Sequence, residues 1–122
     1  MPTPVDPKEL ALTVAHLCDE RKGEDIKVLD VQNSLAIADY FVLATGRNRR
    51  HLRAMADEAR KTARERGWRF PKEEDGGEAG RWILLDFGDV VVHLLDTDMR
   101  TFYDLDGLWA DAPMIPRPAE SA

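Results

Sequence analysis

RWILLDFGDVVVHLL, residues 81–95, is the stretch that decides the fold of this chain. Two apolar, β-branched runs flank a Gly-containing break at residues 86–89, a pattern that predicts a β-hairpin. With the tip at Phe87-Gly88, one face of the hairpin is wholly apolar and carries Ile83, Leu85, Val90, Val92 and Leu94. The other face mixes aromatic, aliphatic and polar groups: Trp82, Leu84, Asp86, Asp89, Val91 and His93.

The mixed face of the hairpin is expected to be covered by another surface. A face that bordered only water would not ordinarily carry a Trp, a Leu and a Val together. Phe87 is unfavourable in a tight turn that needs positive φ, and Asp86 opposite Asp89 would repel. A four-residue loop keeps the same register, whereas a one-residue bulge would swap the faces on one strand. The alternative for Trp82 is that it packs beneath a helix.

The whole chain has the size and composition of one globular domain. It has 122 residues, 43% of them hydrophobic, enough to bury roughly 68% of the unfolded surface. No apolar run approaches the ~20 residues of a membrane span, and no signal or transit peptide is visible. The single cysteine, Cys18, excludes an intramolecular disulfide and a multi-thiolate metal site, and is expected in the core. We therefore expect a cytoplasmic protein.

The charge of the chain is unevenly distributed. The net charge is −6, but residues 47–69 hold nine Arg or Lys against three Asp or Glu, which leaves −12 elsewhere. An acidic protein with one basic segment is not a general nucleic-acid binder. The basic segment could still face phosphate or an acidic partner.

The remaining elements alternate between helix and strand. The patterns predict a helix over 6–22 capped by Asp6 with a Glu9 capping box, and a helix from Asn48 to Arg66 ended by Gly67. Strands are expected at 26–31, 40–45 and from Trp68, followed by a loop at 73–80 before the hairpin, and Thr97 is expected to cap a short last helix. This order predicts a single α/β domain over 1–112, with a mixed sheet of about five strands flanked by helices. A Pro-rich tail at 113–122 is expected to be extended and loosely held.

No motif in the chain predicts catalysis. Thr45-Gly46, between a buried strand and a helix, lacks the further glycines of a phosphate loop. Four aspartates (Asp86, Asp89, Asp96, Asp98) could in principle hold a divalent metal, but two carboxylates flanking a turn are equally typical of a solvent-exposed hairpin. The three histidines (His16, His51, His93) lie on different expected elements and show no metal-ligand spacing. The arginines of the helix over 49–66 could contact RNA, or could form a solvated face with ion pairs such as Asp57 to Arg60 or Lys61.

Several ordered blocks resemble the ribosomal silencing factor family, also called Iojap-like proteins. They are Asp39-Tyr40-Phe41-Val42 with Ala44-Thr45-Gly46, Trp82 with Leu85-Asp86, Gly88-Asp89-Val90-Val91-Val92-His93, Arg100 with Phe102-Tyr103, and Leu108-Trp109. The resemblance runs from about Val5 to Pro113, and the ordered combination is more specific than any single block.

The resemblance implies an α/β domain with the outline of a nucleotidyltransferase but without its active site. It implies binding to the large ribosomal subunit through large-subunit ribosomal protein fourteen, which blocks joining of the small subunit and represses translation under nutrient limitation. It implies a homodimer when free, no cofactor and no catalysis, and it leaves open a secondary contact to ribosomal RNA. The competing hypotheses are an RNA-binding module using the Arg-rich helix and a nucleotidyltransferase-like enzyme. The enzyme would need a Gly-Ser pair on the loop that opens the helix and an Asp-x-Asp on the next strand. The loop instead reads Thr45-Gly46-Arg47, and the one Asp-x-Asp spacing, Asp96-Thr97-Asp98, is expected to fall after the last strand.

The resemblance also implies a partner-binding site. Trp82 matches the interface tryptophan of the family, and Leu84, His93, Arg100 and Tyr103 lie in the surrounding blocks. These five residues are the expected contact set, and Trp82 is expected to be exposed. On this hypothesis, Trp82→Ala leaves the fold intact and weakens ribosome binding at least ~30-fold.

Overall fold

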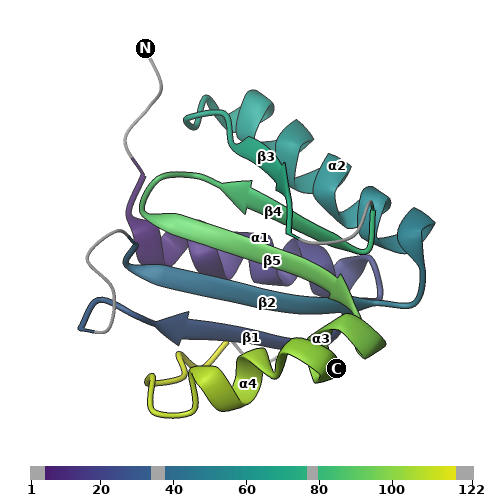
Figure 1. The fold of residues 1–122 in the computed structure, drawn as a ribbon. Coiled ribbons are helices and arrows are strands. Elements are labelled where there is room, and N and C mark those ends of the chain that lie inside the picture. The colour runs from purple at the N-terminus through teal and green to yellow at the C-terminus, as the bar shows by residue number, and fades with distance from the viewer. Residues whose placement is uncertain (1–4, 34–37, 77–79, 118–122) are drawn as a thin grey trace.

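The computed structural model describes residues 5–33, 38–76 and 80–117, which form a mixed sheet packed between helices (Figure 1). In chain order the elements are α1 (Pro7–Glu20), β1 (Glu24–Asp30), β2 (Tyr40–Gly46), α2 (Arg49–Arg66), β3 (Lys72–Asp75), β4 (Trp82–Asp86), β5 (Val90–Asp96), α3 (Thr97–Tyr103) and α4 (Leu105–Leu108). The strand order is β1-β2-β5-β4-β3, with β2 and β5 parallel and the other pairs antiparallel. The α/β fold with five strands predicted from the sequence is confirmed. Within the described ranges, no helix combines the length and the apolar character needed to cross a bilayer.

The hairpin of β4 and β5 forms with a register two residues away from the predicted one. Trp82 pairs with Leu95 rather than with His93. The tip lies at Gly88-Asp89, because Gly88 adopts φ 97° and the Phe87 backbone N–H donates to the Val90 carbonyl at 2.9 Å. A register shift of two residues leaves every side chain on the same face of the sheet, so the predicted division of the hairpin into two faces is correct. Phe87 leaves the turn and packs in the core against Trp68.

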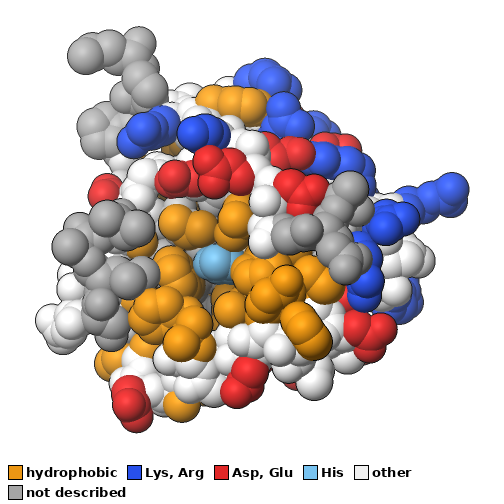
Figure 2. Space-filling view, viewed as in Figure 1, with side chains coloured by type: hydrophobic (Ala, Val, Ile, Leu, Met, Phe, Trp, Pro, Cys, Tyr) orange, Lys and Arg blue, Asp and Glu red, His pale blue; other side chains and the backbone are white. Residues whose placement is uncertain are grey.

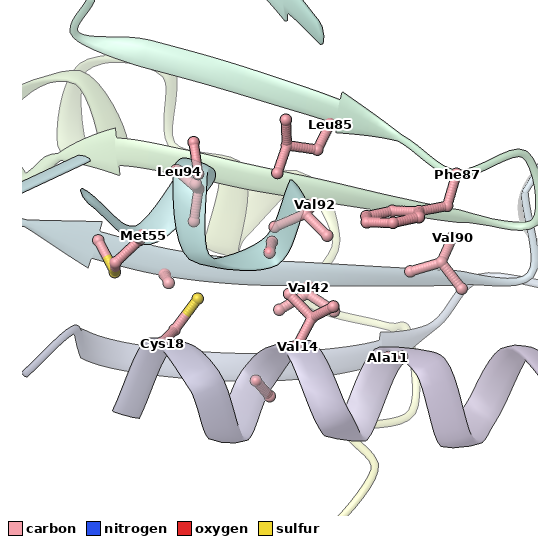
Figure 3. Packing of buried hydrophobic residues seen from close by; sticks show 14 of the residues in the cluster. Ala11, Val14, Cys18, Val42, Met55, Leu85, Phe87, Val90, Val92 and Leu94 are labelled. Atoms are coloured by element: carbon pink, nitrogen blue, oxygen red, sulfur yellow. The ribbon is translucent and has the colours of Figure 1, made fainter. Parts of the chain in front are cut away.

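The main core lies between one face of the sheet and helices α1 and α2 (Figure 3). The apolar face of the hairpin lies entirely in this cluster, together with Val42 and Ala44 of β2. Helix α1 contributes Leu10, Val14 and Cys18, and burial raises the pKa of the Cys18 thiol to about 12. Helix α2 contributes its predicted apolar positions Leu52, Met55, Ala56, Ala59 and Ala63.

The two long helices begin differently from one another. The Asn48 side chain accepts a hydrogen bond from the His51 backbone N–H at 2.8 Å, and α2 ends at Gly67 with φ 70°, as predicted. Asp6 does precede α1, but its side chain makes no capping hydrogen bond, so the expected capping box is wrong. Pro7 at the first helical position supplies the preset φ that starts α1.

Two segments near β4 differ from the expectations. Residues 68–70 form no strand, and the strand instead comprises Lys72–Asp75, most of which falls in the segment 73–80 that is predicted to be a loop. All four side chains of β3 are exposed, so the strand is defined by its backbone pairing to β4 and not by an apolar pattern. Residues 77–79 of the expected loop lie outside the described residues.

The C-terminal region is more ordered than its composition suggests. Asp96, rather than Thr97, caps α3, because its side chain accepts from the Met99 backbone N–H at 2.8 Å. Of the tail predicted to be loosely held, residues 113–117 are described and residues 118–122 lie outside the described residues. The described part lies along β1: the Pro113 carbonyl accepts from Asp30 N–H at 2.8 Å, and Ile115 N–H donates to the Val28 carbonyl at 2.7 Å. This backbone pairing covers the outer edge of β1.

Candidate functional site

The second face of the sheet carries a separate apolar cluster. We call this surface the second face; its buried members are Leu29, Val31, Ala38, Phe41, Leu43, Trp82, Leu95, Met99 and Leu105. Strand alternation turns these side chains away from α1 and α2. The short helices α3 and α4 lie along one margin of the second face, and the rest is open as a broad hydrophobic area with a histidine at its centre (Figure 2). The sheet thus has one face closed by long helices and one face only partly covered.

Trp82 is largely buried on the second face. Its side chain is 9% exposed, and its ring lies 5.0 Å from the ring of Tyr103 on α3. Its indole Nε1–H donates to His93 Nδ1 at 3.4 Å. The expectation that Trp82 is exposed is therefore wrong. The alternative, that Trp82 packs against a helix, describes its environment better, because α3 folds back beside the end of β4.

His93 lies beside Trp82 in an uncharged environment. It is 9% exposed, and its ring packs edge-on against Phe41 at a centroid distance of 4.7 Å. Burial lowers the pKa of His93 to about 4, so the imidazole is neutral at pH 7. Since Nδ1 accepts from Trp82, the proton of the neutral ring resides on Nε2. Within the described residues, Nε2 is buried and has no hydrogen-bond partner.

Leu84 is the cross-strand partner of His93 and lies at the centre of the second face. Leu84 and the neighbouring Val91 are half-buried, so both retain surface that another molecule could cover. The sequence therefore placed Leu84 correctly on an accessible apolar surface.

Arg100 is buried and makes its hydrogen bonds within the protein. It is 6% exposed, and its guanidinium donates two hydrogen bonds to the Asp106 carboxylate, at 2.8 and 2.9 Å. Its Nη1 also donates to the Asp25 carbonyl at 2.6 Å and to Thr45 Oγ1 at 2.9 Å. The expectation that Arg100 contacts a partner directly finds no support in this geometry, because its donors are directed into the protein. Arg100 instead joins α3 to β1, β2 and α4.

Asp106 completes this connection. Its carboxylate also accepts from Lys27 Nζ at 2.7 Å. The hydrogen bonds from Arg100 are the largest cause that holds the pKa of Asp106 well below its usual range, and the hydrogen bond from Lys27 lowers it further. Both act against the partial burial of the carboxylate, which raises its pKa. The carboxylate is therefore ionised throughout the physiological pH range and holds α4 beside β1.

Tyr103 and its neighbours form an aromatic margin to the second face. Tyr103 is 45% exposed and Phe102 is 79% exposed, with their rings 5.0 Å apart. Trp109, after α4, packs edge-on against Phe41 at 5.2 Å. Sequence reasoning did not include Phe41 and Phe102 in the site. Because the apolar run of β2 does not alternate with polar residues, the sequence did not show on which face of the sheet Phe41 lies. The exposure of Phe102 could not be predicted either, because it depends on how α3 packs against the sheet.

Two features of the described part of the chain bear on catalysis, its possible metal ligands and the position where a phosphate loop would begin. Among the described residues, no three His, Cys, Asp or Glu side chains are grouped to hold a metal ion. Gly46 ends β2 where a phosphate loop would begin, but a Cβ there would approach Leu52 Cδ2 to 2.7 Å. Gly46 is thus required for packing of α2 on the sheet, which agrees with the interpretation of Thr45-Gly46 as the turn that starts the helix.

Helix α2 packs on the face of the sheet opposite the second face, and the charges of its arginines are partly neutralised. Arg53 donates to Glu73 at 2.8 Å and, within α2, to Asp57 at 3.1 Å, and Arg60 also approaches Glu73. The expected pairing of Asp57 with Arg60 or Lys61 is replaced by its pairing with Arg53. The Arg60 and Arg64 guanidiniums lie over the ring of Phe70, at 5.2 and 4.9 Å from its centroid.

Taken together, these features are typical of a small α/β binding domain, in which a partly open apolar sheet face meets another macromolecule. The family model described as "ribosomal silencing factor during starvation" matches residues 4–122, and the chain belongs to this family. The resemblance inferred from the ordered sequence blocks is confirmed.

Individual relatives agree with the family match. The chain is 40% identical to the ribosomal silencing factor RsfS of Bacillus subtilis over 107 residues, which cover 88% of this chain and 90% of that protein. It is 35% identical to the chloroplastic protein Iojap of Arabidopsis thaliana over 90% of this chain and 45% of that longer protein. Its fold matches the crystal structure of a Chromobacterium violaceum protein with a TM-score of 0.79 at 28% identity, covering 97% of this chain and 94% of the other.

Proposed function

We propose that this protein binds the large ribosomal subunit through the second face, docking on large-subunit ribosomal protein fourteen. In this proposal the bound protein occupies the surface that the small subunit needs, and so represses translation in the cytoplasm under nutrient limitation. It acts by steric occlusion and carries out no chemical step. The free protein is a homodimer, which analytical ultracentrifugation would test directly.

The observation that carries the proposal is the partly covered apolar surface. Leu84 and Val91 are half-buried at its centre, and Tyr103, Phe102 and Leu108 leave large apolar area exposed at its margin. Exposed apolar area of this kind marks interaction sites in proteins, and aromatic anchors dominate interface energetics. Membership of the ribosomal silencing factor family makes a ribosomal surface the occupant to test.

The test is co-sedimentation of the purified protein with isolated large and small subunits, followed by a subunit-joining assay. Phe102→Glu on the second face is expected to weaken retention on the large subunit by at least about 10-fold, because a charge would be buried against an apolar surface. Lys61→Glu, on the exposed side of α2, is the matched control and should bind as the unmodified chain does. Equal retention of both variants would exclude the second face as the docking surface.

RNA binding by α2 is the second candidate function, and Phe70 is the observation that favours it. Phe70 is 41% exposed beneath two guanidiniums, so an exposed aromatic group accompanies the arginines. Contacts to phosphates would make binding fall steeply with salt, whereas docking on a protein surface gives a shallower dependence. Binding to the large subunit at several salt concentrations, compared for the unmodified chain and Arg64→Ala, separates the two candidates.

A further inference from the structure

On the second face, His93 is a polar side chain whose hydrogen bonding is incomplete. Its Nε2 is buried and has no hydrogen-bond partner among the described residues. Leaving a buried donor unpaired destabilises the folded protein, and such groups are rare in folded proteins. This unpaired donor belongs to the second face, which is the surface proposed for docking.

The tautomer of His93 is set by its neighbour on β4. Trp82 Nε1–H has only a donor role, so the His93 Nδ1 that it contacts at 3.4 Å must be the acceptor. The neutral ring then carries its proton on Nε2. The pair therefore presents a fixed N–H donor rather than a group that can switch between donor and acceptor.

His93 lies on the face of the sheet that the long helices do not cover, and 9% of it is exposed. Figure 2 shows a broad apolar area on this side of the molecule. Phe41 lies against the ring, and Leu84 is its cross-strand neighbour. Since Nε2–H is already removed from water in the free protein, an occupant whose acceptor displaces the side chains around it would gain a hydrogen bond without a further cost of dehydrating the donor.

The surroundings also select the kind of acceptor. Among the described residues, those that pair with His93 in the sheet or contact its ring are Trp82, Phe41, Leu84 and Leu43, and none of them carries a charge. A carboxylate or phosphate buried here would lack a cation to balance it, which is costly in an apolar environment. A neutral oxygen, such as a backbone carbonyl, fits this position.

We propose that His93 is a specificity-determining residue of the second face, whose Nε2–H donates to a neutral oxygen of the protein that docks there. The inference rests on the proposed function, and it adds a requirement to that function. The docked surface is apolar but must present one hydrogen-bond acceptor at its centre. Apolar surfaces without such an acceptor would leave the donor unpaired and are therefore disfavoured.

Two variants separate the two nitrogens of the ring. In His93→Gln, the side-chain amide can place an N–H donor near the position of Nε2. In His93→Asn, the shorter amide reaches only the position of Nδ1, where its oxygen can still accept from Trp82. Both replace the ring by an amide, so a difference between them reports on the outer donor.

The experiment measures affinity for isolated large subunits by co-sedimentation, with thermal unfolding of each variant as the control for folding. We expect His93→Asn to bind roughly 10-fold more weakly than the unmodified chain, and His93→Gln to stay within about 3-fold of it. If both variants bind like the unmodified chain, or both lose affinity in proportion to lost stability, His93 is only a core residue and the inference is wrong. If the unmodified chain fails to bind large subunits, the proposed function itself is overturned, and the inference with it.

Discussion

Replacement of Trp82 by alanine tests whether α3 covers the second face as the structure shows. Trp82 is 9% exposed, contacts Tyr103, and donates to His93. Truncating a buried Trp to Ala costs about 3–5 kcal/mol, and the hydrogen bond to His93 is included in that loss. Since domains of this size have a stability of roughly 5–15 kcal/mol, the variant should lose about a fifth of its stability or more.

The assay is urea unfolding followed by circular dichroism, with thermal unfolding alongside. For a chain of 122 residues, a loss of 3–5 kcal/mol corresponds to a fall of about 12–20 °C in the melting temperature. The control is Phe102→Ala, an aromatic truncation at a side chain that is largely exposed, which should change stability by less than about 0.5 kcal/mol.

An unchanged unfolding midpoint in Trp82→Ala would refute this reasoning. It would mean that Trp82 projects into solvent and that α3 does not cover it, as the sequence alone suggested. A destabilised Trp82→Ala also changes how its ribosome binding is interpreted, because lost affinity would combine a folding defect with a lost contact. Leu84 and Phe102 are therefore better positions for testing the docking surface.

Two further predictions concern charged and titrating groups. Burial lowers the pKa of His93 from 6.5 to about 4, so between these pH values the unfolded chain binds a proton more readily than the folded chain does. The contribution of neutral His93 to the free energy of unfolding is therefore fully present above about pH 6.5 and falls by about 3 kcal/mol towards pH 4. His93→Gln should remove this part of the pH dependence in urea unfolding at pH 4–7, and an unchanged slope would contradict burial of a neutral imidazole. Asp106→Asn leaves Arg100 without its carboxylate, which should cost about 1–3 kcal/mol, given that water reaches part of the Asp106 side chain. Because the pKa of Asp106 is lower in the folded chain than in the unfolded chain, its contribution to the free energy of unfolding is present above about pH 4 and is lost as the pH falls below that value. The variant and the unmodified chain should therefore converge in stability in acid. A constant difference in stability down to pH 2 would argue against the ion pair.

The division of the hairpin into two faces was predictable because strand alternation is a local property. The predicted register was displaced by two residues, since Gly88 rather than Phe87 occupies the tip, yet a displacement of two keeps every side chain on its side. The ends of α2 were equally predictable, because Asn48 and Gly67 act on backbone groups within a few residues of themselves. Strand β3 was missed because its charged side chains carry no apolar pattern and only pairing with β4 defines it.

The candidate site was predictable only in part. Leu84 and Tyr103 have the accessible surface expected of contact residues, and whether they touch a partner stays a prediction. The resemblance to a family identified Trp82 and Arg100 by position in the sequence, and position does not determine exposure. Arg100 is buried because it bonds to the Asp25 carbonyl and to Thr45, groups that lie 75 and 55 residues earlier in the chain.

The sequence by itself determined the class of fold, the two-sided character of the sheet and the family of the protein, because periodicity, capping and ordered motifs are all carried by the chain. Only the tertiary structure decided what covers the second face. That outcome depends on where α3 and α4 return to the sheet, and the ties that fix them, from Arg100 and from Lys27 to Asp106, join segments far apart in the sequence. No local pattern encodes such ties, because each partner acquires its role only when the fold brings it within hydrogen-bond distance of the other.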